Sequence, residues 1–155
     1  MSYSSPDSFI QIENEYTDIS RNYNYVSLLG DFNGRTSDDD DFILVHVYER
    51  REGDDTGEYL ENEIYTLDQL NIPRKRSNRD KVKNGYGEKM LDCCKGNNFF
   101  ILHGRLGDDK GEGRVTCKGV STVDYCICTS SLLEYCTNFS SNFRSFGYFL
   151  GHHKR

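Results

Sequence analysis

The stretch YVSLLGDFN at residues 25–33 places the tightest constraint on how this chain folds. Its β-prone apolar run ends at Gly30, which predicts a short buried strand followed by a sharp turn. Because side chains alternate between the two faces of an extended chain, Asp31 and Asn33 are expected to point the same way, with Phe32 pointing back toward the core. The sequence therefore predicts a carboxylate and an amide together at the end of a strand.

Two interpretations of this pair remain open. A carboxylate that holds a proton or a metal, beside an amide that donates to a phosphate oxygen, suits the hydrolysis of a phosphate ester. Asp and Asn also favour turns because their side chains bond to the nearby backbone, and from spacing alone an ordinary turn at the end of a strand is the favoured interpretation.

Length and charge limit the class of protein. At 155 residues the chain is long enough for one domain with a real core. Its net charge of −6 excludes a broadly basic nucleic-acid binder, so any contact with a polyanion must be local. No apolar stretch approaches the roughly 18 residues of a membrane span, and the N-terminus lacks a signal pattern. The sequence therefore predicts a soluble, intracellular protein that does not contact membranes; it does not distinguish nucleus from cytoplasm.

Two charged runs fall within residues 34–83, a polar stretch that we expect to be a flexible insertion. Four consecutive acids at 38–41 are typical of a solvated loop, although acids close to Asp31 could also disturb metal binding. The strongly basic segment from Arg74 to Lys83 could contact nucleic-acid phosphates or direct the protein to the nucleus. A solvated linker is the competing, and favoured, interpretation of that segment.

The six cysteines do not form the spacing of a zinc site. Most lie within apolar runs, and no secretion signal precedes them, so buried free thiols are expected rather than disulfides. They are Cys93, Cys94, Cys117, Cys126, Cys128 and Cys136.

The remaining pattern predicts alternating helices and strands. Apolar residues recur at helical spacing in 6–21, and a shorter helix is expected at 88–95. Compact apolar runs predict strands at 99–102 and 121–128, and a helical turn follows at 130–136.

A second motif lies at 121–125, with the sequence STVDY. Together with LLGDFN, it resembles the signature of the endonuclease/exonuclease/phosphatase superfamily, which has the DNase-I-like fold. The intervening helix and the stretch ILHGR at 101–105 are similar to the endonuclease domains associated with retroelements, although His103 stands where those domains often have Asn. The resemblance covers roughly residues 25–133.

The resemblance implies an α/β fold of the DNase-I-like type, a four-layer sandwich that cleaves phosphodiester or phosphomonoester bonds with Mg²⁺. Asp31 would position or deprotonate the attacking water and bind the metal, and Asn33 would steady the phosphate. Asp124 would orient a catalytic histidine, because a carboxylate behind an imidazole fixes its tautomer and favours its charged form.

The chain also departs from the family pattern. The strands that carry the family's metal-binding Glu and an early Asn are not matched, so residues 1–155 are expected to form a partial domain without its N-terminal half and with an uncovered sheet face. The closing Ser-Asp-His is absent; His152 and His153 lie near the expected distance from Asp124 but follow Gly151.

Two functions are therefore expected as alternatives. One is a metal-dependent nucleic-acid hydrolase that is weak or inactive as this chain, unless nearby acids or another chain complete the site. The other is a catalytically silent fragment of a mobile-element endonuclease that acts at most as a binding module. The sequence leaves open whether the chain is an enzyme.

Overall fold

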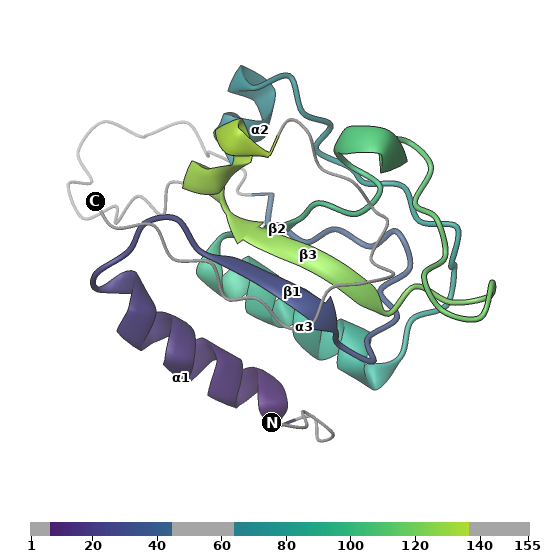
Figure 1. Cartoon of the computed structure of the whole chain (residues 1–155), viewed down its shortest axis with the longest axis horizontal. Helices are drawn as coiled ribbons and strands as arrows, with labels where there is room; N and C mark the ends of the chain where they lie inside the picture. The colour runs from purple at the N-terminus through teal and green to yellow at the C-terminus, as the bar shows by residue number, and fades with distance from the viewer. Residues whose placement is uncertain (1–6, 45–63, 137–155) are drawn as a thin grey trace, which may run out of the picture.

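The computed structural model describes residues 7–44 and 64–136, which combine helices with one small sheet (Figure 1). No helix in these two ranges has the length and hydropathy that crossing a membrane requires. In chain order the elements are α1 (Ser8–Ser20), β1 (Ser27–Asp31), α2 (Ile64–Gln69), α3 (Gly85–Asn97), β2 (Phe99–Ile101), the 3₁₀ turn η1 (Gly107–Asp109), β3 (Asp124–Thr129) and the 3₁₀ turn η2 (Ser130–Tyr135).

The sheet has the strand order β1-β3-β2, and both pairings are antiparallel. The strand that comes first in the sequence, β1, therefore lies at an edge of the described sheet. The strand that comes last, β3, lies at its centre. Along the β1–β3 ladder, the register runs from Ser27 opposite Cys128 to Asp31 opposite Asp124. The strands predicted before Asp31, at 99–102 and at 121–128 are confirmed, although β3 begins at Asp124 rather than at residue 121.

Helices α1 and α3 cover one face of this sheet, and α3 lies behind the strands in Figure 1. Alternate residues of β3, Tyr125 and Ile127, point to this face and join Phe99 and Ile101 of β2 in a buried apolar cluster. The predicted helix at 6–21 is confirmed as α1, and the one at 88–95 is confirmed but longer. Asn84 caps the longer helix by accepting a hydrogen bond from the Gly87 amide at 2.8 Å.

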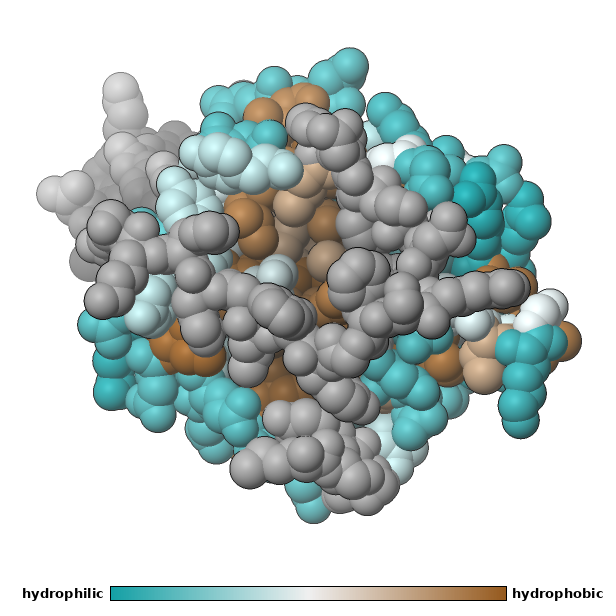
Figure 2. Space-filling model, in the orientation of Figure 1, coloured by the Kyte–Doolittle hydropathy of each residue, from teal (hydrophilic) through white to brown (hydrophobic). Residues whose placement is uncertain are grey.

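The other face carries a second apolar cluster, which includes Phe100 and Cys128 and is covered by α2 and η2. In the view of Figure 2, hydrophobic side chains gather in the middle of the molecule over β2 and β3, with hydrophilic side chains around them. Alternation along β3 places Asp124 on this same face, beyond the cluster. All six cysteines are free, as predicted.

The described ends of the predicted insertion are packed. Asp41, expected in a solvated acidic loop, is 1% exposed and forms an ion pair with the fully buried Arg105 at 2.7 Å. Arg76, Asn78 and Asp80 of the basic segment are also buried, so the expectation of a solvated linker is wrong for them. Charged side chains can be buried here because they find partners from distant parts of the chain. Residues 45–63 lie outside the described ranges.

Candidate active site

The carboxylates of the two motifs are brought together by the sheet. Asp31 ends β1 and Asp124 begins β3, and the two residues are direct partners in the antiparallel ladder. The next backbone bond runs from the Phe32 amide to the Val123 carbonyl at 2.9 Å, so the pair is of the non-hydrogen-bonded class. In that class the Cα atoms are about 4.5 Å apart and the side chains share one face.

Among the described residues, both carboxylates keep at least one oxygen that accepts no hydrogen bond. Asp31 is exposed and Asp124 is half-buried. One oxygen of Asp31, Oδ1, accepts a hydrogen bond from the Asn33 amide at 2.8 Å. Within residues 7–44 and 64–136, no hydrogen bond or ion pair reaches the carboxylate of Asp124. Oxygens of both side chains are therefore available to a ligand at the end of the sheet.

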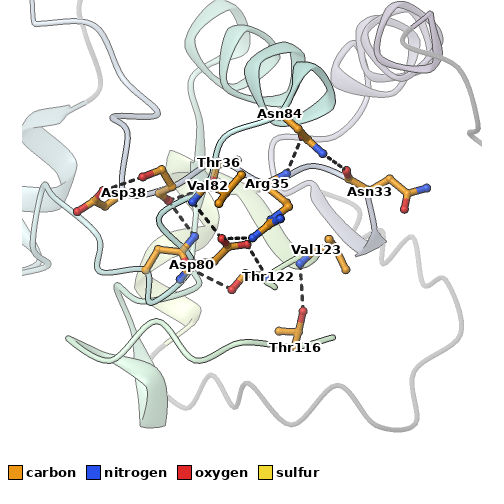
Figure 3. Close-up of polar contacts among 12 residues, drawn as sticks. Asn33, Arg35, Thr36, Asp38, Asp80, Val82, Asn84, Thr116, Thr122 and Val123 are labelled. Carbon is orange, nitrogen blue, oxygen red and sulfur yellow. Dashed lines mark hydrogen bonds and ion pairs between the residues drawn. The ribbon is translucent and has the colours of Figure 1, made fainter. Parts of the chain in front are cut away.

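The chain turns at Asn33, where the backbone adopts the left-handed conformation with φ 52°. The bond from its amide to Asp31 is an Asx turn, so the turn interpretation of the Asp-Asn pair is correct as local structure. The alternation that predicted a common direction for Asp31 and Asn33 stops at the end of β1. The exposed side chain of Asn33 instead points away from the polar network behind it (Figure 3).

Asn84 fastens this turn to the start of α3. Its side-chain oxygen accepts from the amides of Arg35, at 2.9 Å, and Gly87, at 2.8 Å. Its side-chain nitrogen donates to the carbonyl of Asn33 at 3.0 Å (Figure 3). The sequence predicted a helix only from residue 88 and did not indicate this role of Asn84, because Asn33 and Arg35 lie some 50 positions earlier.

Asp80 contacts the segments on both sides of the carboxylate pair. Arg35 donates to it through two nitrogens, Nε and Nη2, each at 2.7 Å. The amides of Thr122 and Val82 donate to it at 3.0 Å. Burial opposes ionisation of Asp80, but these hydrogen bonds hold its pKa below the usual value. Asp80 is therefore a charged acceptor inside the protein, and sequence reasoning missed it.

Thr116 supports the entry into β3. Its hydroxyl accepts a hydrogen bond from the amide of Val123 at 3.1 Å (Figure 3). It also accepts one from the amide of Asp124 at 3.1 Å. The Asp124 amide, which makes no ladder bond to Asp31, is thus held by a side chain.

His103 lies away from the carboxylate pair. It is fully buried, its Nδ1 is 3.1 Å from Asp109 Oδ2, and its ring packs edge-on against Tyr125. Tyr125 follows Asp124 and points to the opposite, helix-covered face of the sheet. Burial lowers the pKa of His103, with Asp109 opposing the effect. His103 is therefore a core residue, and His152 and His153 lie outside the described ranges.

The exposed cations of the basic segment, for which contact with phosphates was the less favoured interpretation, are paired with carboxylates. Its surface cations each face an acidic side chain, which reduces the local positive field. The pairs are Arg74 with Asp68, Lys75 with Asp40, Arg79 with Glu112, Lys81 with Asp38 and Lys83 with Asp39. Three of these five pairs join the acidic run to the basic segment. The paired charges of this surface do not support nucleic-acid binding.

The oxygens of Asp31 and Asp124 suit a hard cation whose other ligands are waters or phosphate oxygens. Mg²⁺ prefers oxygen ligands, often keeps several waters, and is commonly bound by one or two carboxylates together with substrate phosphates. Asp31 and Asp124 supply two such carboxylates. In the part of the chain that the structure describes, no group of three His, Cys, Asp or Glu side chains could hold a metal ion.

Comparisons with family models, curated proteins and solved structures found no match to this chain.

Proposed function

We propose that this chain carries a metal-dependent phosphodiester hydrolase site of the endonuclease/exonuclease/phosphatase type. The observation that supports this most is the direct cross-strand pairing of Asp31 with Asp124. The two residues come from motifs at opposite ends of the resemblance, and the motif spacing alone does not dictate that they should be partners. Their juxtaposition is what a shared active site requires.

Each residue of the site would have a role that follows from its chemistry. A bound Mg²⁺ would neutralise charge on the phosphate and polarise it. Asp31 and Asp124 would hold the ion between them, and Asp31 would also orient the attacking water. Asn33, exposed beyond the turn, would donate to a phosphate oxygen through its amide nitrogen. If a histidine of the chain acts at this site, Asp124 would orient it.

A catalytically silent binding module is the alternative. It is favoured by the small number of protein ligands: the described residues offer two carboxylates, without the further Glu that the family resemblance would add. Such a pair holds Mg²⁺ weakly unless a phosphate or another chain completes the coordination.

Cleavage of supercoiled plasmid DNA with added Mg²⁺ tests the proposal. The variants are Asp31→Asn and Asp124→Asn, with Asp18→Asn as a control because Asp18 is exposed on α1. We expect Mg²⁺-dependent nicking that each site variant lowers by about 100-fold or more, and that the control leaves unchanged. Background-level signal from every protein would contradict hydrolysis of DNA and favour the silent module.

A further inference from the structure

We propose that Asp80 is a positioning residue, whose buried carboxylate sets the separation of Asp31 and Asp124 by joining the segments that lie just beyond them. The geometric part of this inference stands on the contacts alone. Its consequence for metal binding and cleavage rests on the proposed function.

The carboxylate connects two segments that are far apart in the sequence. Its bidentate pair with Arg35 holds the loop that leaves β1, and its bond from the Thr122 amide holds the segment that enters β3. Figure 3 shows Asp80 between these two segments. Arg35 lies three residues after Phe32 and Thr122 one residue before Val123, so both contacts lie just beyond the last described backbone bond of the ladder, from Phe32 to Val123. Asp80 therefore continues the cross-link where the sheet stops.

The charge on Asp80 is needed for this role. Each carboxylate oxygen accepts two hydrogen bonds: Oδ1 from Arg35 and Val82, and Oδ2 from Arg35 and Thr122. An amide in the same place has one oxygen and presents an NH₂ group to donors, so it cannot accept all four bonds. Bidentate Arg–carboxylate pairs also restrict orientation more strongly than a single bond does.

A neutral connection runs beside the charged one. Asn78 accepts from the Thr122 hydroxyl at 3.1 Å and donates to the Ser37 carbonyl at 2.8 Å. The two segments therefore stay attached when the carboxylate of Asp80 is lost, and we expect loosened positions rather than unfolding. That expectation makes a substitution at Asp80 informative.

Spacing matters because of the ligand that the pair would take. Mg²⁺ requires near-ideal octahedral geometry with short oxygen distances, so two carboxylates bind it together only when their separation is held. Asp80 itself is 3% exposed, so its carboxylate is not open to a substrate at the surface.

Asp80→Asn is compared with Asp39→Asn, which removes a carboxylate of a more exposed ion pair with Lys83. Amide hydrogen exchange followed by NMR needs no activity. We expect exchange at Thr122 to accelerate at least tenfold in Asp80→Asn, with shifted amide signals at Asp31 and Asp124. The control leaves these signals in place. Arg35→Lys, which keeps the charge but loses the fork, gives a smaller change of the same kind.

The plasmid assay supplies the functional readout. In Asp80→Asn the Mg²⁺ concentration for half-maximal cleavage rises about tenfold, and saturating Mg²⁺ restores most of the rate because Asp31 and Asp124 are still present. A merely structural loss would not be restored in this way.

The outcomes separate the two proposals. If Asp80→Asn leaves exchange at Thr122 and the signals of Asp31 and Asp124 as they are in Asp39→Asn, the positioning role is wrong whether or not the protein cleaves DNA. If exchange and signals change as expected while even the unsubstituted chain fails to cleave, the positioning role stands and the proposed hydrolase function fails.

Discussion

At the scale of single residues, buried charge pairs between distant segments determine how the loops around the sheet are held. Asp41 and Arg105 are the clearest case. The carboxylate accepts two hydrogen bonds from the guanidinium at 2.7 Å and a third from the Ile101 amide. Burial opposes ionisation of Asp41, but Arg105 holds its pKa below the usual value.

Asp41→Asn should destabilise the protein by about 3–5 kcal/mol, because it leaves the buried guanidinium of Arg105 without its counter-charge. Urea unfolding followed by circular dichroism measures the change. Asp68→Asn is the matched control, since Asp68 forms a similar pair with Arg74 in solvent. We expect the control to change stability little; equal losses in the two variants would contradict the importance assigned to burial.

Acid should destabilise the protein through these same groups. Asp41 and Asp80 both have a lowered pKa in the folded state, so their contribution to stability is full above the unfolded pKa of about 3.9 and is lost as pH falls through the folded value. Melting temperatures measured from pH 7 to pH 2 should fall most steeply below about pH 4. Asp80→Asn should show a shallower decline, and parallel curves would refute the linkage.

Sequence reasoning could not find these residues. Asp41 is one of four consecutive acids, and nothing local marks it as the buried one. Asp80 and Arg76 lie in a segment whose composition predicts exposure. Their burial depends on partners that only the folded chain brings near: Arg35 for Asp80, and Thr36 and the Asp39 carbonyl for Arg76. Asp31 was predictable as a candidate because it follows an apolar strand, and Asp124 because STVDY resembles a family motif, but their pairing was not.

At the scale of elements, apolar periodicity predicted the helices and strands whose pattern is local in the sequence. The helix α1 and the three strands follow from local patterns, and β3 was placed within a few residues. The strand order was not predictable, because it depends on which edges meet after collapse. The close approach of α3 to the loop after β1 was not predictable either. It is possible because Gly87 has no Cβ atom.

Gly87→Ala should disturb that approach. A Cβ atom at Gly87 would lie 1.9 Å from the carbonyl oxygen of Arg35, so the backbone must move. We expect a loss of about 1–3 kcal/mol in unfolding free energy and weaker cleavage if the chain is active. Gly85→Ala is the control in the same helix, since nothing lies within 4 Å of its added Cβ.

The control should leave stability unchanged or raise it by less than about 1 kcal/mol, because Ala loses less backbone entropy than Gly on folding. Similar losses in both variants would indicate that helix propensity, rather than contact with Arg35, governs the effect. The comparison uses urea unfolding for both proteins.

At the scale of the whole molecule, the described residues form one sheet with two helices on one face and shorter elements on part of the other. This agrees with the general prediction of a mixed fold of helices and strands. The four-layer sandwich implied by the family resemblance remains a prediction. What the molecule contributes as a whole is the placing of two carboxylates, Asp31 and Asp124, opposite each other at one end of its sheet.

The most direct test of that account is a titration with Mn²⁺ followed by NMR, because this paramagnetic ion broadens the signals of amides close to where it binds. We predict that the amides of Asp31 and Asp124 broaden first and together, and that added Mg²⁺ reverses the effect by competition. Broadening that begins instead at residues 38–40, or that leaves Asp31 and Asp124 unaffected, would contradict a metal site between the two strands.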